Sequence, residues 1–146
     1  MTHKFFHANI STMDPIVLYK ILQIRTDVFV VEQHCPYPEL DGRDLEPDSE
    51  QVWVTVDDEI AGTIRILRDS DALRIGRVVV AAKHRGTGVA RELFTYALER
   101  CANINPDSKL VLDAQAPLQD WYGSFGFEPV GEIFMEDGIP HITMER

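Results

Sequence analysis

Long hydrophobic runs are absent from the sequence. The longest apolar stretches, Val28–Val31 and Val78–Ala82, fall far short of the roughly 18 residues that a membrane-spanning helix requires, so we expect no membrane partner. The first residues have neither an extended apolar region nor a small-residue cleavage site, and they do not read as a secretory signal. Cysteine is also scarce, with Cys35 in a proline-rich stretch and Cys101 on the apolar face of an expected helix. Two cysteines agree with a reducing compartment, and we expect a cytoplasmic protein.

Basic residues are few as well. The chain has 14 lysines and arginines against 24 aspartates and glutamates, which gives a formal net charge of -10 at pH 7. Nucleic-acid binding relies on clustered lysine and arginine, so nucleic acid is not an expected partner. The same acidic field favours a cationic small molecule or a basic peptide segment. No histidine has the spacing of a metal ligand, and we expect no metal; the histidines are His3, His7, His34, His84 and His141.

No internal repeat, low-complexity tract or glycine-serine linker interrupts the 146 residues. A chain of this length can bury one adequate core, since domains of about 100 to 150 residues are common. We therefore expect a single domain that covers residues 1–146.

Helical and alternating patterns follow one another along the chain. Asp14-Pro15 is typical of an N-cap with proline at the first helical position, and apolar residues then recur at helical spacing as far as Phe29. Alternation in Val52–Val56 and the segment Ile60–Leu67 predict a hairpin, and Asp137-Gly138 predicts the turn of a later one. The other expected elements are strands at 73–81 and 109–113, helices at 89–101 and 118–125, and the hairpin arms 127–135 and 139–144.

These elements predict an α/β (α+β) domain, in which a mixed, mostly antiparallel sheet of roughly six or seven strands is flanked by about three helices. The run Val78-Val79-Val80 is apolar on both faces, which favours a central strand. An acidic loop between Glu39 and Glu50 is rich in proline and glycine, and we expect most of its charges to be solvated.

The chemistry is concentrated in a strand, a basic glycine-rich loop and the start of a helix. The strand Val78–Val80 is followed by Arg85-Gly86-Thr87-Gly88-Val89-Ala90-Arg91. The first N–H groups of a helix have no internal partner and carry roughly half a positive charge, so a pyrophosphate can bind there. Glycines let phosphate oxygens approach the backbone, and Arg85 adds a fixed charge. The segment predicts an anion-binding loop, although such residues also form ordinary turns before helices.

Two other phosphate-binding loops are excluded at particular residues. A P-loop needs lysine and then serine or threonine after its last glycine, and here Gly88 is followed by Val89 and Ala90. A Rossmann loop needs a third glycine where this chain has Arg91. A nucleotide phosphotransferase stays a further hypothesis, which requires that ATP raise the melting temperature of the protein.

With these residues the sequence resembles the GNAT superfamily of N-acetyltransferases. Its signature Gln/Arg-x-x-Gly-x-Gly/Ala is met by Arg85, Gly88 and Ala90. The segment Trp121-Tyr122-Gly123-Ser124-Phe125-Gly126-Phe127 is similar to the superfamily's aromatic-Tyr-x-x-x-Gly-Phe motif. The resemblance covers nearly the whole chain. Within the superfamily the sequence resembles the ElaA-like branch, through Val28–Gln33, Cys35–Tyr37 and Glu136–His141.

The resemblance implies the single-domain acyl-CoA N-acyltransferase (GNAT) fold and an enzyme that passes the acetyl group of acetyl-CoA to a primary amine by direct attack. It implies that Tyr122 donates to the departing thiolate and that Gln115 contacts the cofactor, at a position where many members have asparagine. The cofactor-binding residues that it implies are Val78, Val79, Val80, Arg85, Gly86, Thr87, Gly88, Val89, Ala90, Arg91 and Gln115.

The general base and the acceptor are defined less closely. GNAT acceptor sites lie near the end of the first helix, which makes Glu32 the first candidate for the base. Asp41 and His141 are the reserves, and we expect both to contact the substrate. A small-molecule amine and a peptide amine both suit the site, and a homodimer is compatible with it. The alternative function is a non-catalytic acyl-CoA-binding or interaction module on the same fold.

Overall fold

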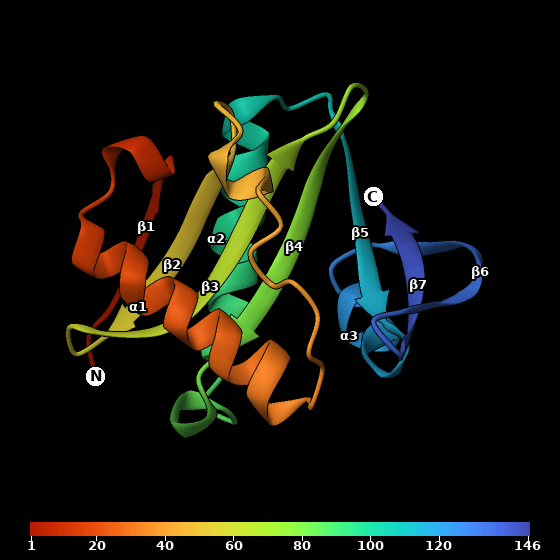
Figure 1. Ribbon diagram of the computed structural model, residues 1–146. Helices are drawn as coiled ribbons and strands as arrows, with labels where there is room; N and C mark the ends of the chain where they lie inside the picture. The colour runs from red at the N-terminus through yellow and green to blue at the C-terminus, as the bar shows by residue number, and fades with distance from the viewer.

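A seven-stranded sheet runs through the computed structural model, which describes residues 1–146 (Figure 1). The strand order is β1-β2-β3-β4-β5-β7-β6. The strands are β1 His3–Ala8, β2 Glu50–Val56, β3 Glu59–Arg68, β4 Ala72–Val80, β5 Lys109–Gln115, β6 Glu128–Glu136 and β7 Ile139–Glu145. This mixed, mostly antiparallel sheet confirms the expected fold class.

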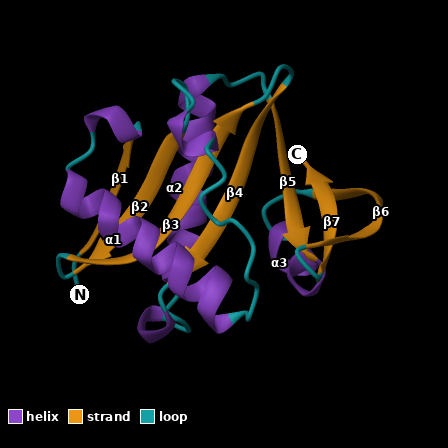
Figure 2. Cartoon of the chain, in the orientation of Figure 1, coloured by secondary structure: helices purple, strands orange, loops and turns teal.

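The pairing of β4 with β5 divides the sheet into two parts. Strands β1 to β4 pair antiparallel with their neighbours in the chain, whereas β4 and β5 run parallel. The parallel ladder joins residues 72–74 to residues 109–111 and goes no further. Past Arg74 the two strands separate, and Figure 2 shows β5, β7 and β6 turning away from β4. Val79 and Val80 therefore have ladder partners only on the β3 side, and Val78 has none.

The helices lie on both faces of the sheet. They are α1 Pro15–Thr26, α2 Val89–Ile104 and α3 Gln119–Gly123. In Figure 1, α1 crosses one face of β1 to β4 and α2 lies behind the other, while α3 lies beside β5. None of these helices combines the length and the apolar character needed to cross a membrane.

Helix α1 begins as predicted and ends earlier. The Asp14 carboxylate accepts a hydrogen bond from the Val17 N–H at 3.2 Å, with Pro15 in the first turn. The α-helix ends at Thr26, and a π-helix continues it from Asp27 to Glu32. π-helical turns are rare and are frequent next to functional sites, because the wider turn redirects the side chains that follow.

Helix α2 packs an apolar stripe against the sheet. Its buried residues are Val89, Leu93, Phe94, Ala97 and Cys101. The predicted core position of Cys101 is confirmed, and burial raises the pKa of its thiol to about 12. Phe94 packs edge-on against Trp121 and Tyr122, with ring centroids 5.5 and 5.4 Å away. These aromatic contacts fix α3 against α2, so they set the position of Tyr122.

The expectation that the acidic loop is mostly solvated is wrong. Asp44 and Glu50 are buried, at 6% and 7% exposure, and the Glu39 side chain is 8% exposed. Arg25 pairs with Glu39 and Asp44, and Arg100 pairs with Glu50. The partners come from α1 and α2, so the loop is held to the rest of the molecule by ion pairs between residues far apart in the sequence.

Candidate functional site

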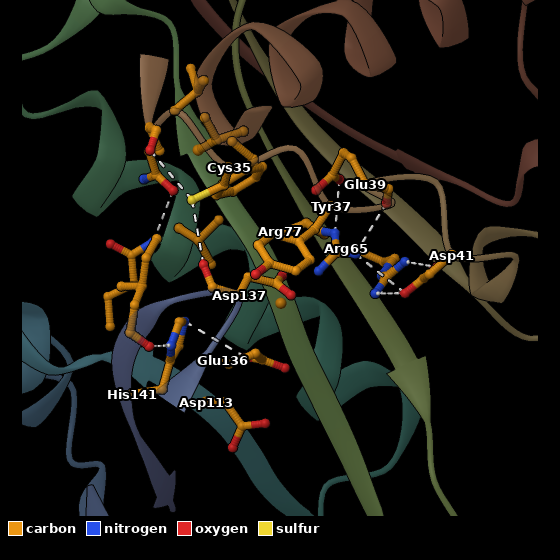
Figure 3. Close-up of a pocket in the computed structure, with 18 of the residues that line it drawn as sticks. Cys35, Tyr37, Glu39, Asp41, Arg65, Arg77, Asp113, Glu136, Asp137 and His141 are labelled. Atoms are coloured by element: carbon orange, nitrogen blue, oxygen red, sulfur yellow. Dashed lines mark hydrogen bonds and ion pairs between the residues drawn. The ribbon is translucent and has the colours of Figure 1, made fainter. Parts of the chain in front are cut away.

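A cleft of about 860 Å³ opens where β4 and β5 separate. Strand β4 contributes one wall, β5, α3 and the β6–β7 hairpin contribute the other, and the π-helix with the loop after it also lines the space (Figure 3). The predicted site residues in its lining are Glu32, Asp41, Val78, Val79, Val80, Arg85, Gln115, Tyr122 and His141. The rest of the predicted loop, residues 86–91, lies outside this lining at the start of α2.

Strand β4 carries a bulge on the cleft wall. Between the pairs Thr63–Val79 and Arg65–Gly76, β4 has one residue more than β3. Arg77 lies in this bulge with a φ of +50°, a left-handed conformation that costs energy for a residue other than glycine. Bulges re-aim side chains and are frequent next to active sites. The edge of β4 that faces the cleft therefore offers backbone groups without a ladder partner.

The glycine-rich loop lies before α2, as predicted. Gly86 and Gly88 have φ values of +76° and +83°, and Gly88 is the N-cap of α2. A Cβ at either position would meet nothing within 4 Å, so backbone conformation, not crowding, requires glycine here. The Thr87 hydroxyl donates to the His84 carbonyl at 2.7 Å and closes the loop. No side chain caps the helix, so its first N–H groups can bind an anion.

The two arginines of the predicted loop point in different directions. Arg85 donates to the Glu32 carboxylate at 2.8 Å and to the Val80 carbonyl at 3.1 Å. Arg91 donates to the Ser124 hydroxyl at 2.8 Å, in the segment after α3. Arg85 therefore connects the loop to the cleft, and Glu32, the candidate base, is engaged with a cofactor-side arginine.

Tyr122 reaches the cleft from α3. The residue is 6% exposed and packs edge-on against Trp121 with ring centroids 5.0 Å apart. Burial raises the pKa of the Tyr122 phenol, and no hydrogen bond from the protein offsets this effect. The hydroxyl therefore stays protonated and is free to donate to a ligand in the cleft.

Two contacts join the segment after the π-helix to β5 and to the β6–β7 turn. Gln115 of β5 donates to the Gln33 side chain at 3.4 Å. Cys35 lies 3.6 Å from the carbonyl oxygen of Asp137, in the β6–β7 turn (Figure 3). Asp137 and Gly138 both have positive φ, as the predicted type I′ turn requires. The segment after the π-helix thus reaches over the cleft to β5 and to the hairpin.

Ion pairs on the β3–β4 wall were not predicted from the sequence. Arg65 donates to both carboxylate oxygens of Asp41, at 2.8 and 3.0 Å, and Arg77 lies 3.3 Å from Asp41 and 2.8 Å from Glu39. Burial alone would raise the pKa of Asp41, but hydrogen bonds from Arg65 and the Arg43 backbone lower it to about 2. Asp41, a predicted substrate ligand, is therefore already engaged by arginine.

A buried arginine with two carboxylate partners anchors this wall. Arg25 is 0% exposed and donates to Glu39 at 2.7 Å and to Asp44 at 2.8 Å. Burial opposes ionisation of Asp44, but the hydrogen bond and the charge of Arg25 hold its pKa below the ordinary value. The buried arginine therefore fixes the loop that carries the Asp41 wall.

A second ion-pair group links β4 to β5 and β7. Arg74 pairs with Asp69 at 2.8 Å and with Asp113 at 3.1 Å, and the Thr143 hydroxyl donates to Asp113 at 2.7 Å. These carboxylates are neutralised within the protein, so the overall acidic charge does not by itself define what the cleft binds. The sequence feature that could have indicated these ion pairs is the presence of arginines in otherwise apolar strands.

His141 reaches the cleft from β7, where it lies opposite Gln115 in register. It is 9% exposed. The structure contains no group of three or more histidine, cysteine, aspartate or glutamate side chains placed to hold a metal ion.

Comparison with known sequences gives matches along most of the chain. The family of acetyltransferase (GNAT) domains matches residues 22–146. Protein ElaA of Escherichia coli strain K12 is 48% identical over 143 residues, which cover 96% of this chain and 92% of that protein. A UPF0039 protein of Mycobacterium tuberculosis is 40% identical over 151 residues, which cover 100% of this chain and 94% of that protein.

Solved structures share the arrangement of strands and helices. The crystal structure of Escherichia coli ElaA has a TM-score of 0.93 at 42% identity and covers 99% of both chains. That of an acyl-CoA N-acyltransferase from Pseudomonas aeruginosa has a TM-score of 0.94 at 38% identity, again over 99% of both chains. An aminoglycoside 6'-N-acetyltransferase complexed with coenzyme A shares the fold, with a TM-score of 0.72 at 13% identity over 97% of this chain and 96% of that one.

Proposed function

The chain belongs to the GNAT acetyltransferase family and is an acyl-CoA-dependent N-acyltransferase, and we propose that it transfers acetyl from acetyl-CoA to a primary amine. The observation that carries the proposal is the cleft between β4 and β5. Its lining combines the open edge of β4, the Arg85 guanidinium and the free hydroxyl of Tyr122. An acyl-CoA molecule needs these three features: backbone partners for its pantetheine amides, positive charge for its phosphates and a hydrogen-bond donor for its sulfur.

The cofactor is proposed to follow β4 from the loop into the cleft. Gly86 to Arg91 and the first N–H groups of α2 bind the pyrophosphate, and Arg85 adds its charge. The backbone of Val78–Val80 pairs with the pantetheine amides, and the Gln115 amide contacts the cofactor from β5. All these groups belong to the single domain that we propose for residues 1–146, at work in the cytoplasm.

In the proposed reaction the amine nitrogen attacks the thioester carbonyl directly. The nitrogen lone pair forms the C–N bond, the C–S bond breaks, and its electron pair leaves on sulfur. A lysine-like amine with a pKa of about 10.4 is neutral in fewer than about one molecule in a thousand near pH 7, a handicap of roughly 4 kcal/mol or more. The nitrogen must therefore lose a proton to a base. A backbone N–H of β4 near Val80 stabilises the tetrahedral oxyanion by roughly 3 kcal/mol.

Tyr122 is proposed to hydrogen-bond to the departing thiolate. An ordinary phenol, with a pKa of about 10, is a weaker acid than a thiol at about 8.5. Burial raises the pKa of Tyr122 further. Full proton transfer to sulfur is thus unfavourable, and the hydroxyl acts as a hydrogen-bond donor that stays protonated.

The test measures both binding and turnover. Calorimetry with coenzyme A and acetyl-CoA measures association, and a chromogenic disulfide measures thiol release in the presence of spermidine, lysine, glucosamine or a lysine-containing peptide. The expected result is micromolar binding and thiol release with at least one amine, faster with acetyl-CoA than with longer acyl-CoA esters. Binding without turnover over the whole panel would instead support the non-catalytic module. Absence of binding would refute the proposal.

A further inference from the structure

His141 occupies a fixed place in the cleft. It lies on β7, where its neighbours across the ladder are Gln115 on β5 and Phe134 on β6. Its ring is stacked on Phe134, with centroids 6.0 Å apart and 29° between the planes. The side chain is 11% exposed and lines the same cleft as Tyr122. The ring is therefore held in place by the sheet and is open to the cleft at its edge.

The hydrogen bonds of His141 define which nitrogen carries the proton. Nδ1 lies 2.7 Å from the carbonyl oxygen of Ile139, and a carbonyl can only accept, so Nδ1 carries the hydrogen. In the neutral ring the lone pair is then on Nε2. The contact of Nε2 in the protein is Glu136, whose Oε2 lies 3.7 Å away, beyond hydrogen-bond distance. A nitrogen that is basic, oriented and without a hydrogen-bond partner thus faces the cleft.

Glu32 has the opposite arrangement. Its carboxylate accepts a hydrogen bond from Arg85 at 2.8 Å. The guanidinium thus occupies the carboxylate that would have to accept the proton of the amine. Arg85 also bonds to the Val80 carbonyl, so this pair lies on the cofactor side of the cleft. The base that the sequence favoured is thus tied to the phosphate-binding group.

We propose that His141 is the general base of the transfer, an inference that rests on the proposed function. Nε2 of His141 takes one proton from the bound ammonium group, which frees the nitrogen lone pair to attack the thioester carbonyl. The second proton, which the nitrogen loses as the amide forms, passes through water to the departing thiolate. The imidazolium that forms keeps its Nδ1–H bond to Ile139 and gains a charged neighbour in Glu136. The proton returns to solvent after the thiol and the amide have left.

Several titratable groups line the same cleft as the His141 ring. Glu136 comes from β6, Asp137 from the turn, Asp113 from β5, Cys35 from the loop over the cleft and Tyr122 from α3. Figure 3 shows Glu136 and Asp113 near His141. Asp113 is engaged by Arg74 and Thr143, and Glu136 is the carboxylate in contact with Nε2, at 3.7 Å.

The test compares His141→Asn with the native protein. The asparagine amide keeps a donor for the Ile139 carbonyl and removes the Nε2 lone pair. With the best primary amine of the panel, kcat/KM is expected to fall by about 100-fold or more. Hydroxylamine is largely neutral at the assay pH and needs no base before it attacks, so the fall is expected to shrink to a few-fold. His7→Asn is the matched control and is expected to keep kcat, because His7 lies in β1 and does not line the cleft. Glu32→Gln is tested beside it.

Further measurements separate a base from a residue that only supports the fold. Melting temperature and acetyl-CoA affinity of His141→Asn should match the native protein. In His141→Ala, added imidazole should restore part of the rate with the primary amine. Nitrogen-15 NMR of the ligand-free native protein should find the proton of the neutral ring on Nδ1.

The outcomes distinguish the two proposals. A native protein that releases no thiol with any amine contradicts the proposed function itself. Turnover by the native protein together with an unimpaired His141→Asn, an equal loss with hydroxylamine and the primary amine, or a proton on Nε2 overturns only the role of His141. Loss of kcat in Glu32→Gln, with His141→Asn unchanged, would return the base to Glu32.

Discussion

The Arg85 guanidinium lies 2.8 Å from the Glu32 carboxylate and joins the loop before α2 to the π-helix after α1. A pyrophosphate bound as we propose would therefore meet an arginine that already has an anionic partner. Both side chains are more than 40% exposed, at 42% and 46%, so the pair contributes little to stability. We expect the pair to matter for binding, because Glu32 competes with the proposed cofactor for Arg85.

Removal of the Glu32 charge is expected to strengthen cofactor binding. In Glu32→Gln, Arg85 no longer has to leave a carboxylate, and the affinity for acetyl-CoA should rise by up to about fivefold, which corresponds to roughly 1 kcal/mol. The gain should shrink in high salt, because exposed charges are screened. Calorimetry at low and high ionic strength measures both effects.

The control for this prediction is Glu59→Gln. Glu59 pairs with Lys83, before the same loop, and does not line the cleft. The variant removes the same net charge and leaves the Arg85 pair intact. Equal gains in both variants would assign the effect to overall charge, and weaker binding in Glu32→Gln would mean that Glu32 orients Arg85 toward phosphate.

Gly88→Ala should weaken cofactor binding through the backbone. Gly88 has a φ of +83° in open space, so the alanine is strained by roughly 1 to 2 kcal/mol and shifts the first N–H groups of α2. The affinity for coenzyme A should fall about tenfold if the bound loop needs the same conformation. Gly131→Ala is the matched control, since Gly131 has the same φ of +83° and open space in β6. It should lose similar stability in urea unfolding and no affinity.

Tyr122→Phe should impair turnover and spare the fold. The hydroxyl has no hydrogen bond within the protein, so its removal should change the melting temperature little. A hydrogen bond to a charged group contributes about 1.5 to 3 kcal/mol, which predicts a fall in kcat of about 10- to 100-fold with unchanged acetyl-CoA affinity. Because the raised pKa keeps the phenol protonated, the native pH–rate profile should show no step from Tyr122 below pH 9 or so. A variant that keeps full activity would remove Tyr122 from the mechanism.

Acid should destabilise the protein over a pH range that is set by the Asp41 carboxylate in the cleft wall. The pKa of Asp41 is lowered from 3.8 to about 2, so its contribution to the free energy of unfolding is complete above about pH 5 and is lost as the pH falls from about 4 to 2. Because Asp41 is partly exposed and solvent screens its ion pairs, the contribution is at most about 1 kcal/mol. Urea unfolding at a series of pH values measures it, and in Asp41→Asn the part of the acid transition due to this carboxylate should disappear. Identical pH profiles of the two proteins would contradict the assignment.

Arg25→Met should lower the free energy of unfolding, because it breaks the buried ion pairs behind the β3–β4 wall. It leaves Glu39 and Asp44 buried with one partner fewer, a loss of about 3 to 5 kcal/mol for a broken buried pair. Arg43→Met is the control, because Arg43 is 36% exposed in its pairs with Glu46 and Asp69, and exposed pairs contribute less than about 1 kcal/mol. Equal losses of unfolding free energy in the two variants would mean that the buried pairs of Arg25 contribute no more than the exposed pairs of Arg43.

Local features of the fold could be predicted from neighbouring residues. Asp14-Pro15 starts α1, Asp137-Gly138 makes the last turn, and Val78–Val80 lies in a central strand, because each signal depends on backbone or burial preferences within a few residues. The end of α1 could not be placed, since the π-helix depends on the cleft that it lines. The same holds for the Arg77 bulge, which exists only against β3.

Long-range ion pairs could not be predicted. Asp41 is 24 residues from Arg65 and 36 from Arg77, and a carboxylate in a loop is ordinarily solvated. Its pairing became visible only when β3 and β4 brought both arginines to one wall. The candidate site shares this limit: the loop motif and Tyr122 could be located by resemblance, whereas the engagement of Glu32 by Arg85 and the oriented ring of His141 required coordinates.

Strand β7 lies between β5 and β6, so the order of synthesis and the order in space differ in this half of the protein. On the ribosome, β1 to β4 can pair as they emerge, whereas β5 must wait for β7 to complete its ladder. Leu110 and Arg146 close that ladder with two backbone hydrogen bonds of 2.9 Å. The second wall of the cleft therefore cannot be complete until β7 has been made.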